Sequence, residues 1–312
     1  MDHAIVTDKL TRRFGRLEAV HDLTLQVPAG SIFGLIGPNG AGKTTTLKVL
    51  MNIMGPTAGR ASVLGVDSRR LAPAQFAQIG YVSENQQLPT WMTVRELLAY
   101  CKPFYPTWDD GLSARLVELL DLPLDRKIRY LSRGTRMKAS LISSLAYRPK
   151  LLVLDEPFSG LDPLMRDEFV QGVLELAGEG GWSAVISSHD LEEIERLIDW
   201  VAYLHQGRLA FAESVADLQA RFRQIEITSP TMEKPSLPEP LPAAWLNVTS
   251  SGSTIGLVHS QYVPGDTERE LQARFPGAQI QAMALSLRET FIALARQGRA
   301  RPVLETSGGS RS

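Results

Sequence analysis

Short apolar runs separated by glycine, proline and polar turns dominate the first part of the chain. Most runs are only three to seven residues long and rich in β-branched side chains, which is typical of strands. Leu151-Leu152-Val153-Leu154 is apolar without interruption, as in a parallel strand that a sheet buries on both faces. The predicted strands are residues 4–6, 23–27, 31–36, 60–66, 151–154 and 183–187, and a helix is predicted at 191–198. The pattern predicts an α/β domain.

Leucines recur at helical spacing between residues 94 and 147, which predicts a helical subdomain over about residues 85–150 inside a first domain of residues 1–222. The segment 229–243 carries five prolines, too many for a helix or a central strand, and is predicted to be a loop. A hairpin at 246–259 and two capped helices then predict a small α+β domain over residues 223–305 that contains this proline-rich loop. Residues 306–312 are predicted to be a disordered tail.

The composition argues against several classes of protein. The net charge is -1 with scattered Lys and Arg, so no basic surface for nucleic acid is expected. The single cysteine, Cys101, excludes an intramolecular disulfide and any multi-cysteine metal site. The first ten residues lack the apolar core of a secretory signal, and no run reaches the roughly 18 apolar residues of a membrane helix. We expect a cytoplasmic chain that would need a separate polypeptide for any membrane role.

The segment from Gly37 to Thr44 follows the predicted strand 31–36 and opens a helix, so it has the context of a phosphate-binding loop. Glycines let backbone N–H groups curl inward around phosphate oxygens, and the helix N-terminus adds partial positive charge. Lys43 is expected to reach the β- and γ-phosphates, and the Thr44 hydroxyl to bind Mg²⁺. The predicted nucleotide-binding residues here are Gly37, Asn39, Gly40, Ala41, Gly42, Lys43, Thr44 and Thr45.

Two carboxylates, Asp155 and Glu156, follow the apolar strand 151–154, where an open α/β sheet binds its ligands. Asp155 is suited to hold Mg²⁺ beside Thr44, and Glu156 to orient and polarise a water for attack on the γ-phosphate. His189 follows the next predicted strand and is placed to donate a hydrogen bond to that phosphate. The predicted catalytic residues are thus Lys43, Glu156 and His189.

Residues 4–222 resemble the nucleotide-binding subunit of ATP-binding cassette (ABC) transporters. The motifs occur in the family's order: the phosphate loop, Leu131-Ser132-Arg133-Gly134-Thr135 as the signature motif, Asp155-Glu156, Ser159-Gly160-Leu161-Asp162 as the D-loop, and His189 as the switch histidine. The resemblance implies a P-loop NTPase fold, with a RecA-like core and antiparallel β and helical subdomains. It further implies that Phe14 stacks on adenine, and that Ser132, Gly134 and Asp162 contact nucleotide across a head-to-tail dimer.

The chain departs from the family pattern at two places. Glu84 stands where the family has a glutamine that senses Mg²⁺ and the permease, and we expect its carboxylate to bind Mg²⁺. In the signature motif, Arg133 and Thr135 replace glycine and glutamine. An aromatic-rich segment just beyond Glu84 is interpreted either as a groove for a permease helix or as the core of the helical subdomain; it comprises Leu88, Trp91, Tyr100, Phe104, Tyr105 and Trp108.

The resemblance implies an ATPase that uses ATP and Mg²⁺ to energise a separate membrane permease. It favours an exporter over an importer. One cassette per chain implies a homodimer, or a heterodimer with a related subunit, held by the permease on the inner face of the membrane. Two alternatives stand beside this hypothesis. One is a soluble ABC-family ATPase acting on ribosomes or nucleic acid, and the other is a regulatory partner that binds ATP without hydrolysing it.

Overall fold

The computed structural model describes residues 2–177, 181–229 and 236–300. The chain forms two compact units, Met1–Ala212 and Glu213–Ser312. The division falls before the predicted boundary near residue 222, because α7 (Val215–Arg221) belongs to the second unit. The guanidinium group of Arg221 binds the Glu213 carboxylate at 2.6 Å and the Ser260 carbonyl at 2.7 Å, and these bonds tie α7 to the second unit.

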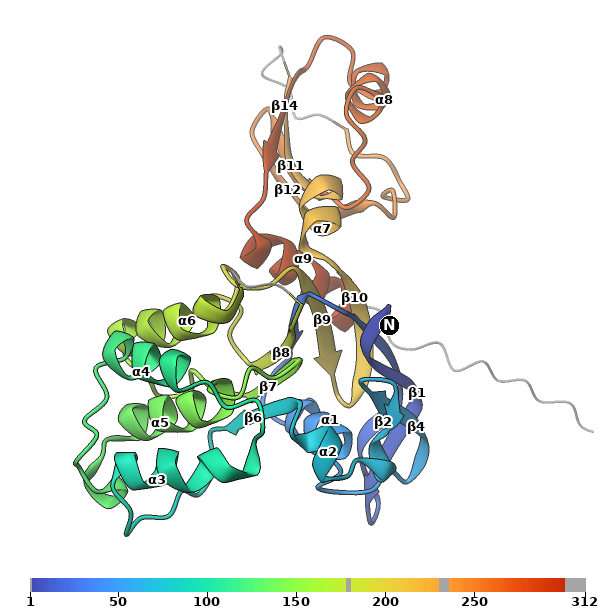
Figure 1. Ribbon diagram of the computed structural model, residues 1–312. Helices are drawn as coiled ribbons and strands as arrows, with labels where there is room; N and C mark the ends of the chain where they lie inside the picture. The colour runs from blue at the N-terminus through green and yellow to red at the C-terminus, as the bar shows by residue number, and fades with distance from the viewer. Residues whose placement is uncertain (1, 178–180, 230–235, 301–312) are drawn as a thin grey trace, which may run out of the picture. The chain divides into compact units, whose positions relative to one another are not determined.

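Two sheets build the first unit (Figure 1). The antiparallel four-stranded sheet has the order β2-β1-β4-β5, with β1 at His3–Phe14, β2 at Leu17–Pro28, β4 at Ala58–Val63 and β5 at Val66–Asp67. The six-stranded sheet has the order β10-β9-β3-β8-β7-β6. Its strands are β3 (Ile32–Ile36), β6 (Ile79–Ser83), β7 (Leu151–Asp155), β8 (Ser183–Ser188), β9 (Trp200–His205) and β10 (Arg208–Ser214).

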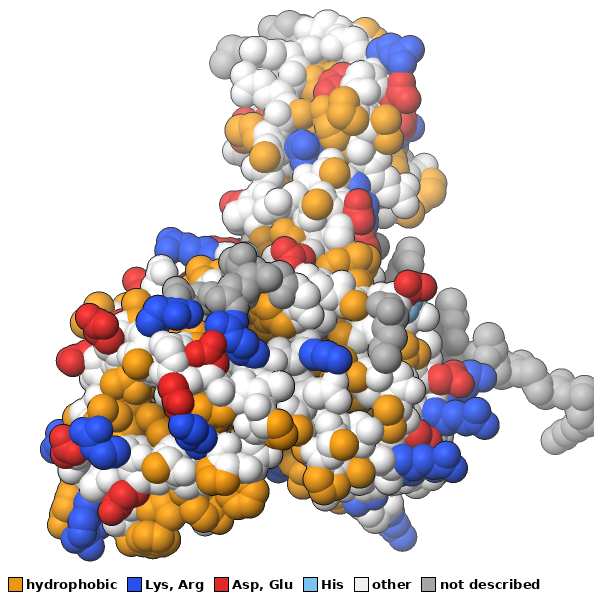
Figure 2. All heavy atoms as spheres, viewed as in Figure 1, with side chains coloured by type: hydrophobic (Ala, Val, Ile, Leu, Met, Phe, Trp, Pro, Cys, Tyr) orange, Lys and Arg blue, Asp and Glu red, His pale blue; other side chains and the backbone are white. Residues whose placement is uncertain are grey.

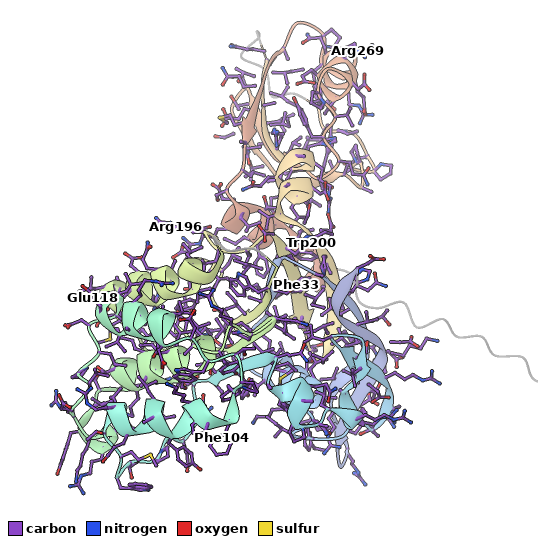
Figure 3. All side chains as sticks on the ribbon, in the orientation of Figure 1. Phe33, Phe104, Glu118, Arg196, Trp200 and Arg269 are labelled. Carbon is purple, nitrogen blue, oxygen red and sulfur yellow. The ribbon has the colours of Figure 1, made fainter. Side chains whose placement is uncertain are left out.

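The central strands are parallel and buried on both faces, as the apolar runs predict. Phe33, labelled in Figure 3, and Val153 are both completely buried. Ile36 on β3 pairs with Ser188 on β8, and Ser187 pairs with Asp155 on β7. Because these strands are parallel and in register, the residues that follow them meet at one edge of the sheet.

The predicted helix at 191–198 is wrong, because the structure has turns there. The N–H groups of Ile194 and Leu197 bond to carbonyls only three residues earlier. Ile194 and Ile198 pack over Gly34 of β3, where an added Cβ would lie 3.1 Å from both side chains. The glycine lets both isoleucines approach β3 closely from these turns.

Helices surround this sheet, and three of them begin at a side-chain cap that the sequence provides. Thr93, Asp109 and Ser132 accept backbone N–H groups at the starts of α3, α4 and α5. Helix α5 packs against α3, α4 and α6, which forms the helical subdomain. The helices of the first unit are α1 (Lys43–Leu50), α2 (Pro73–Phe76), α3 (Val94–Cys101), α4 (Asp110–Leu119), α5 (Arg133–Leu145) and α6 (Pro163–Ala177).

The second unit is an α+β fold with a four-stranded antiparallel sheet of order β12-β13-β11-β14. Its elements after α7 are β11 (Arg223–Thr228), β12 (Trp245–Ser251), β13 (Thr254–His259), α8 (Asp266–Arg274), β14 (Gln279–Ala284) and α9 (Leu287–Ala300). Ile225 and Leu257 from the sheet pack in one buried cluster with Leu271 of α8. The proline-rich segment lies between β11 and β12; its residues 230–235, and the tail 306–312, lie outside the described residues.

Across the described ranges, no helix has both the length and the apolar character needed to cross a membrane.

Candidate nucleotide-binding site

The loop between β3 and α1 requires glycine at two positions for steric reasons. Gly42 has a φ of 101°, a left-handed conformation, and a Cβ there would collide with the Ala19 carbonyl oxygen. A Cβ at Gly37 would collide with the carbonyl oxygen of Leu204 on β9. The loop is therefore held tightly against β2 and β9.

A pocket of about 590 Å³ opens over this loop. It is lined by Phe14, Leu17, Glu18, Ala19, residues 39–45, Glu84, Glu156 and Gln206. Phe14 at the end of β1 is 44% exposed, and the Arg12 guanidinium carbon lies 4.6 Å from its ring centroid. A base could stack on the other face of this ring, as the adenine-stacking prediction requires. Gly37 does not line the pocket, and its role is to accept a hydrogen bond from Lys43.

Lys43 is the first residue of α1 and is almost completely buried. Its ammonium group donates to the Gly37 carbonyl at 2.6 Å and the Pro38 carbonyl at 3.2 Å, and pairs with Glu156 Oε1 at 3.0 Å. A buried cation needs such acceptors to offset its lost hydration. The carboxylate of Glu156 thus occupies a position at Lys43 that a phosphate oxygen can take.

Asp155, the last residue of β7, is buried beneath Thr44. The Thr44 hydroxyl donates to Asp155 Oδ1 at 2.8 Å, and the Ser187 hydroxyl donates to the same oxygen at 2.8 Å. Burial raises the pKa of Asp155 above its usual range, and the hydrogen bonds from Ser187 and Thr44 partly oppose that rise. A cation beside the carboxylate would favour its ionised form. An oxygen-only set of one carboxylate and one hydroxyl suits Mg²⁺, which takes few protein ligands beside phosphate.

Glu156 has a left-handed backbone, with a φ of 51°, which costs a non-glycine residue about 1–2 kcal/mol. Two hydrogen bonds hold it there, because its N–H donates to the Ser187 carbonyl at 3.2 Å and the Ser187 hydroxyl at 2.9 Å. Its other carboxylate oxygen lies 2.8 Å from His189 Nδ1. Burial acts to raise the pKa of Glu156, but hydrogen bonds from His189 and Lys43 outweigh it and lower that pKa overall. The carboxylate is therefore ionised at neutral pH.

Several predicted site residues lie outside the pocket lining. In the part of the chain that the structure describes, these include Ser132, Gly134, Asp162 and, beside Glu156, Asp155 and His189. Ser132 caps α5, and Asp162 accepts a hydrogen bond from the Met165 N–H in the first turn of α6. Glu84 lines the pocket, but its carboxylate pairs with Arg133 and not with Thr44 or Asp155.

Sequence reasoning missed Ser187, which fixes both Asp155 and Glu156. A signal was present, because Ser187 is the next-to-last residue of β8, the strand beside β7, and pairs with Asp155 in register. Gln206, which lines the pocket from the turn after β9, carried no comparable signal, since only the fold brings that turn to the phosphate loop.

The fold and this site define a P-loop ATPase with a two-sheet cassette and a helical subdomain, as predicted. Residues 20–159 match the ABC transporter family. The daunorubicin resistance ATP-binding protein DrrA3 of Streptomyces coeruleorubidus is 36% identical over 221 residues, which cover 69% of this chain and 69% of that protein. The bacitracin transport ATP-binding protein BcrA of Enterococcus faecalis is 29% identical over 226 residues, 72% of this chain and 73% of that protein.

Solved structures agree with the sequence relatives. A structure described as the ATP-binding subunit of an ABC transporter superimposes with a TM-score of 0.62 at 27% identity, and covers 69% of this chain and 92% of that one. The chain belongs to the ATP-binding subunits of the ABC transporter family, and it is an ATPase of that family. The predicted family, fold class and enzyme class are thereby confirmed.

We expect Ser187→Ala to lower kcat for ATP about tenfold to a hundredfold, because Asp155 loses a donor and Glu156 loses one of its two backbone restraints. The Michaelis constant should change less than threefold, since the serine is not in the pocket lining. Steady-state ATPase kinetics measure both values. Ser143→Ala, which removes a hydroxyl bonded to a carbonyl of its own helix, is the control. A kcat for Ser187→Ala equal to that of the control would contradict the assigned role.

Proposed function

We propose that this chain hydrolyses MgATP as one half of a two-cassette motor that drives a separate membrane permease, in the direction of export. The observation that carries the proposal is the chain of contacts from Lys43 through Glu156, which lines the pocket, to His189. Bacitracin transport and daunorubicin resistance, the roles that the relatives' names give, support the transport setting and the direction.

The proposed mechanism begins with an exchange of partners at Lys43. Phosphate oxygens of ATP take the place of the Glu156 carboxylate, which then keeps its contact with His189 and faces the γ-phosphate. The ionised Glu156 orients a water and accepts its proton during attack. His189 holds the carboxylate by its ring nitrogen.

Thr44 and Asp155 are the residues that would hold Mg²⁺ in this proposal. Bound there, the ion would neutralise charge on the β- and γ-phosphates. Asp155 is kept in place by the Ser187 hydroxyl, so its position does not depend on the nucleotide.

A second cassette completes the proposed site. Ser132, at the exposed start of α5, does not line the pocket over its own phosphate loop, whereas Gly134 is buried against Met165. The exposed Ser132 is the part of the signature segment proposed to cover the phosphate loop of another cassette, and a twofold arrangement of two copies makes both sites equivalent. ATP between the two copies would then stabilise the dimer, and hydrolysis would release it.

We expect Glu156→Gln to lower ATP turnover about a hundredfold or more, because the amide cannot accept the proton of the attacking water. The same change removes the carboxylate that competes with phosphate at Lys43, so ATP should bind more tightly and a MgATP-dependent dimer should accumulate. ATPase assays and size-exclusion chromatography in MgATP measure the two effects. Glu118→Gln on α4, an exposed carboxylate labelled in Figure 3, is the control. Retained turnover in Glu156→Gln would contradict the mechanism.

The permease is proposed to dock on three exposed side chains of the helical subdomain: Trp91, 67% exposed, Tyr100, 55%, and Phe104, 62%. These three residues are called the aromatic surface below. Hydrophobic side chains gather over the α3 region in Figure 2, and Phe104 is labelled there in Figure 3. Aromatic side chains exposed in this number are typical of a protein interface.

The other three members of the sequence set are half-buried, which supports the core interpretation for those three. Tyr105 stacks on the buried Tyr147, with ring centroids 3.7 Å apart, and belongs to the subdomain's own packing. Docking through the aromatic surface would place the chain at the inner face of the cell membrane by way of the permease.

We expect the triple change Trp91→Ala, Tyr100→Ala and Phe104→Ala to release the chain from membranes of the cell that produces it. ATP turnover of the purified variant should stay within about twofold of wild type, because the aromatic surface is separate from the pocket. Sedimentation with membranes measures how much of the chain remains membrane-bound. Leu119→Ala, an exposed apolar side chain on α4, is the control. Unchanged sedimentation of the triple variant would exclude this docking surface.

A further inference from the structure

Glu84 and Arg133 are in contact, although 49 positions separate them in the sequence. Glu84 follows β6, and its N–H donates to the Asp155 carbonyl at 3.0 Å. Arg133 is the first residue of α5, and its guanidinium group donates to the Glu84 carboxylate. These two residues are also the main departures from the family's sequence pattern, so the two departures form one pair in space.

Glu84 stands between two pockets. On one side it lines the nucleotide pocket with Thr44, Thr45 and Glu156. On the other side it lines a polar pocket of about 290 Å³ together with Arg133 and Arg136. The negative charge of Glu84 therefore interacts electrostatically with a ligand bound in the nucleotide pocket.

Three carboxylates line a pocket that must accept a polyanion: Glu18, Glu84 and Glu156. Glu18 forms an ion pair with Arg13, and Glu156 is paired with Lys43 and His189. Glu84 is the third carboxylate, and within the described residues its charged partner is Arg133. Without that partner, its negative charge would repel phosphate at the mouth of the pocket.

Two contacts accommodate an arginine at the first position of α5. The first position of a helix is unfavourable for a cation because of the helix's partial positive charge, and the Glu84 carboxylate offsets that cost. The guanidinium also lies over Gly160, which has a φ of 69°; a Cβ there would be 3.0 Å from Arg133 Nη1. The two side chains keep 46% and 28% of their surface exposed, so the pair adds little to folding stability.

We propose that Arg133 is a positioning residue for nucleotide binding, which neutralises Glu84 and holds its carboxylate against α5. This inference rests on the proposed function of the pocket as the ATP site. The inference explains why Glu84 and Arg133 occur together, although either one alone would indicate a weakened nucleotide site.

The test is a double-mutant cycle of Arg133→Gln, Glu84→Gln and both together, read by titration with a fluorescent ADP analogue in EDTA. In EDTA neither Mg²⁺ nor turnover contributes, so the titration reports the charge balance of the pocket. Arg133→Gln should weaken binding about fivefold at low salt, because Glu84 is left uncompensated. The double variant should return to within twofold of Glu84→Gln, and Arg133→Lys to within twofold of wild type. At 0.5 M salt the loss in Arg133→Gln should shrink to less than twofold.

Arg136→Gln is the matched control, because it removes the same charge from the same helix and the same small pocket. Its affinity should stay within twofold of wild type. Equal affinity of Arg133→Gln and wild type, an equal loss in Arg136→Gln, or a loss that persists in the double variant would each overturn the inference. Absence of binding by the wild-type chain would instead overturn the proposed function of the pocket.

Discussion

The buried ammonium group of Lys43 is the interaction on which the arrangement of the site depends. A buried cation is stable only when acceptors surround it, and the chain supplies two loop carbonyls and the Glu156 carboxylate. The loop carbonyls require the tight curl that Gly37 and Gly42 permit. The carboxylate requires β7 to end level with β3, which the parallel register of the sheet provides. In the proposed mechanism, a phosphate that takes the place of Glu156 at Lys43 also frees the carboxylate that activates the attacking water.

Local spacing was sufficient to predict the phosphate loop, the Asp155-Glu156 pair and the Ser286 cap of α9, because each depends on neighbours a few residues away. The cap predicted at Thr267 is wrong, because α8 begins after Gly265, whose N–H donates to Glu268. Local spacing does not predict contacts between strands that are far apart in the sequence. Ser187 fixes Glu156 in a left-handed conformation, and nothing in the residue type at 156 indicates such a backbone. Strands β1 and β2 each extend over twelve residues where only short strands were predicted. Their register shifts interrupt the apolar alternation that sequence analysis relies on.

Distance in sequence also explains why Glu84 and Arg133 looked like two separate losses. Each replaces a neutral residue of the family pattern with a charge, and only the fold shows that the charges face one another. The second unit presents the opposite situation. Its sheet contains the predicted hairpin, and α9 begins at the predicted Ser286 cap. Within the described residues, however, no three His, Cys, Asp or Glu side chains gather as they would in a metal site.

The most direct test of the central claim is calorimetric titration of ADP with Mg²⁺ into the full chain and into Lys43→Met. The account predicts one ADP per wild-type chain and an affinity lowered about tenfold to a hundredfold in the variant, the value of a lost charge-assisted bond to phosphate. Circular dichroism of both proteins controls for folding. Equal affinity in a folded Lys43→Met chain would show that nucleotide binds elsewhere and would contradict the account.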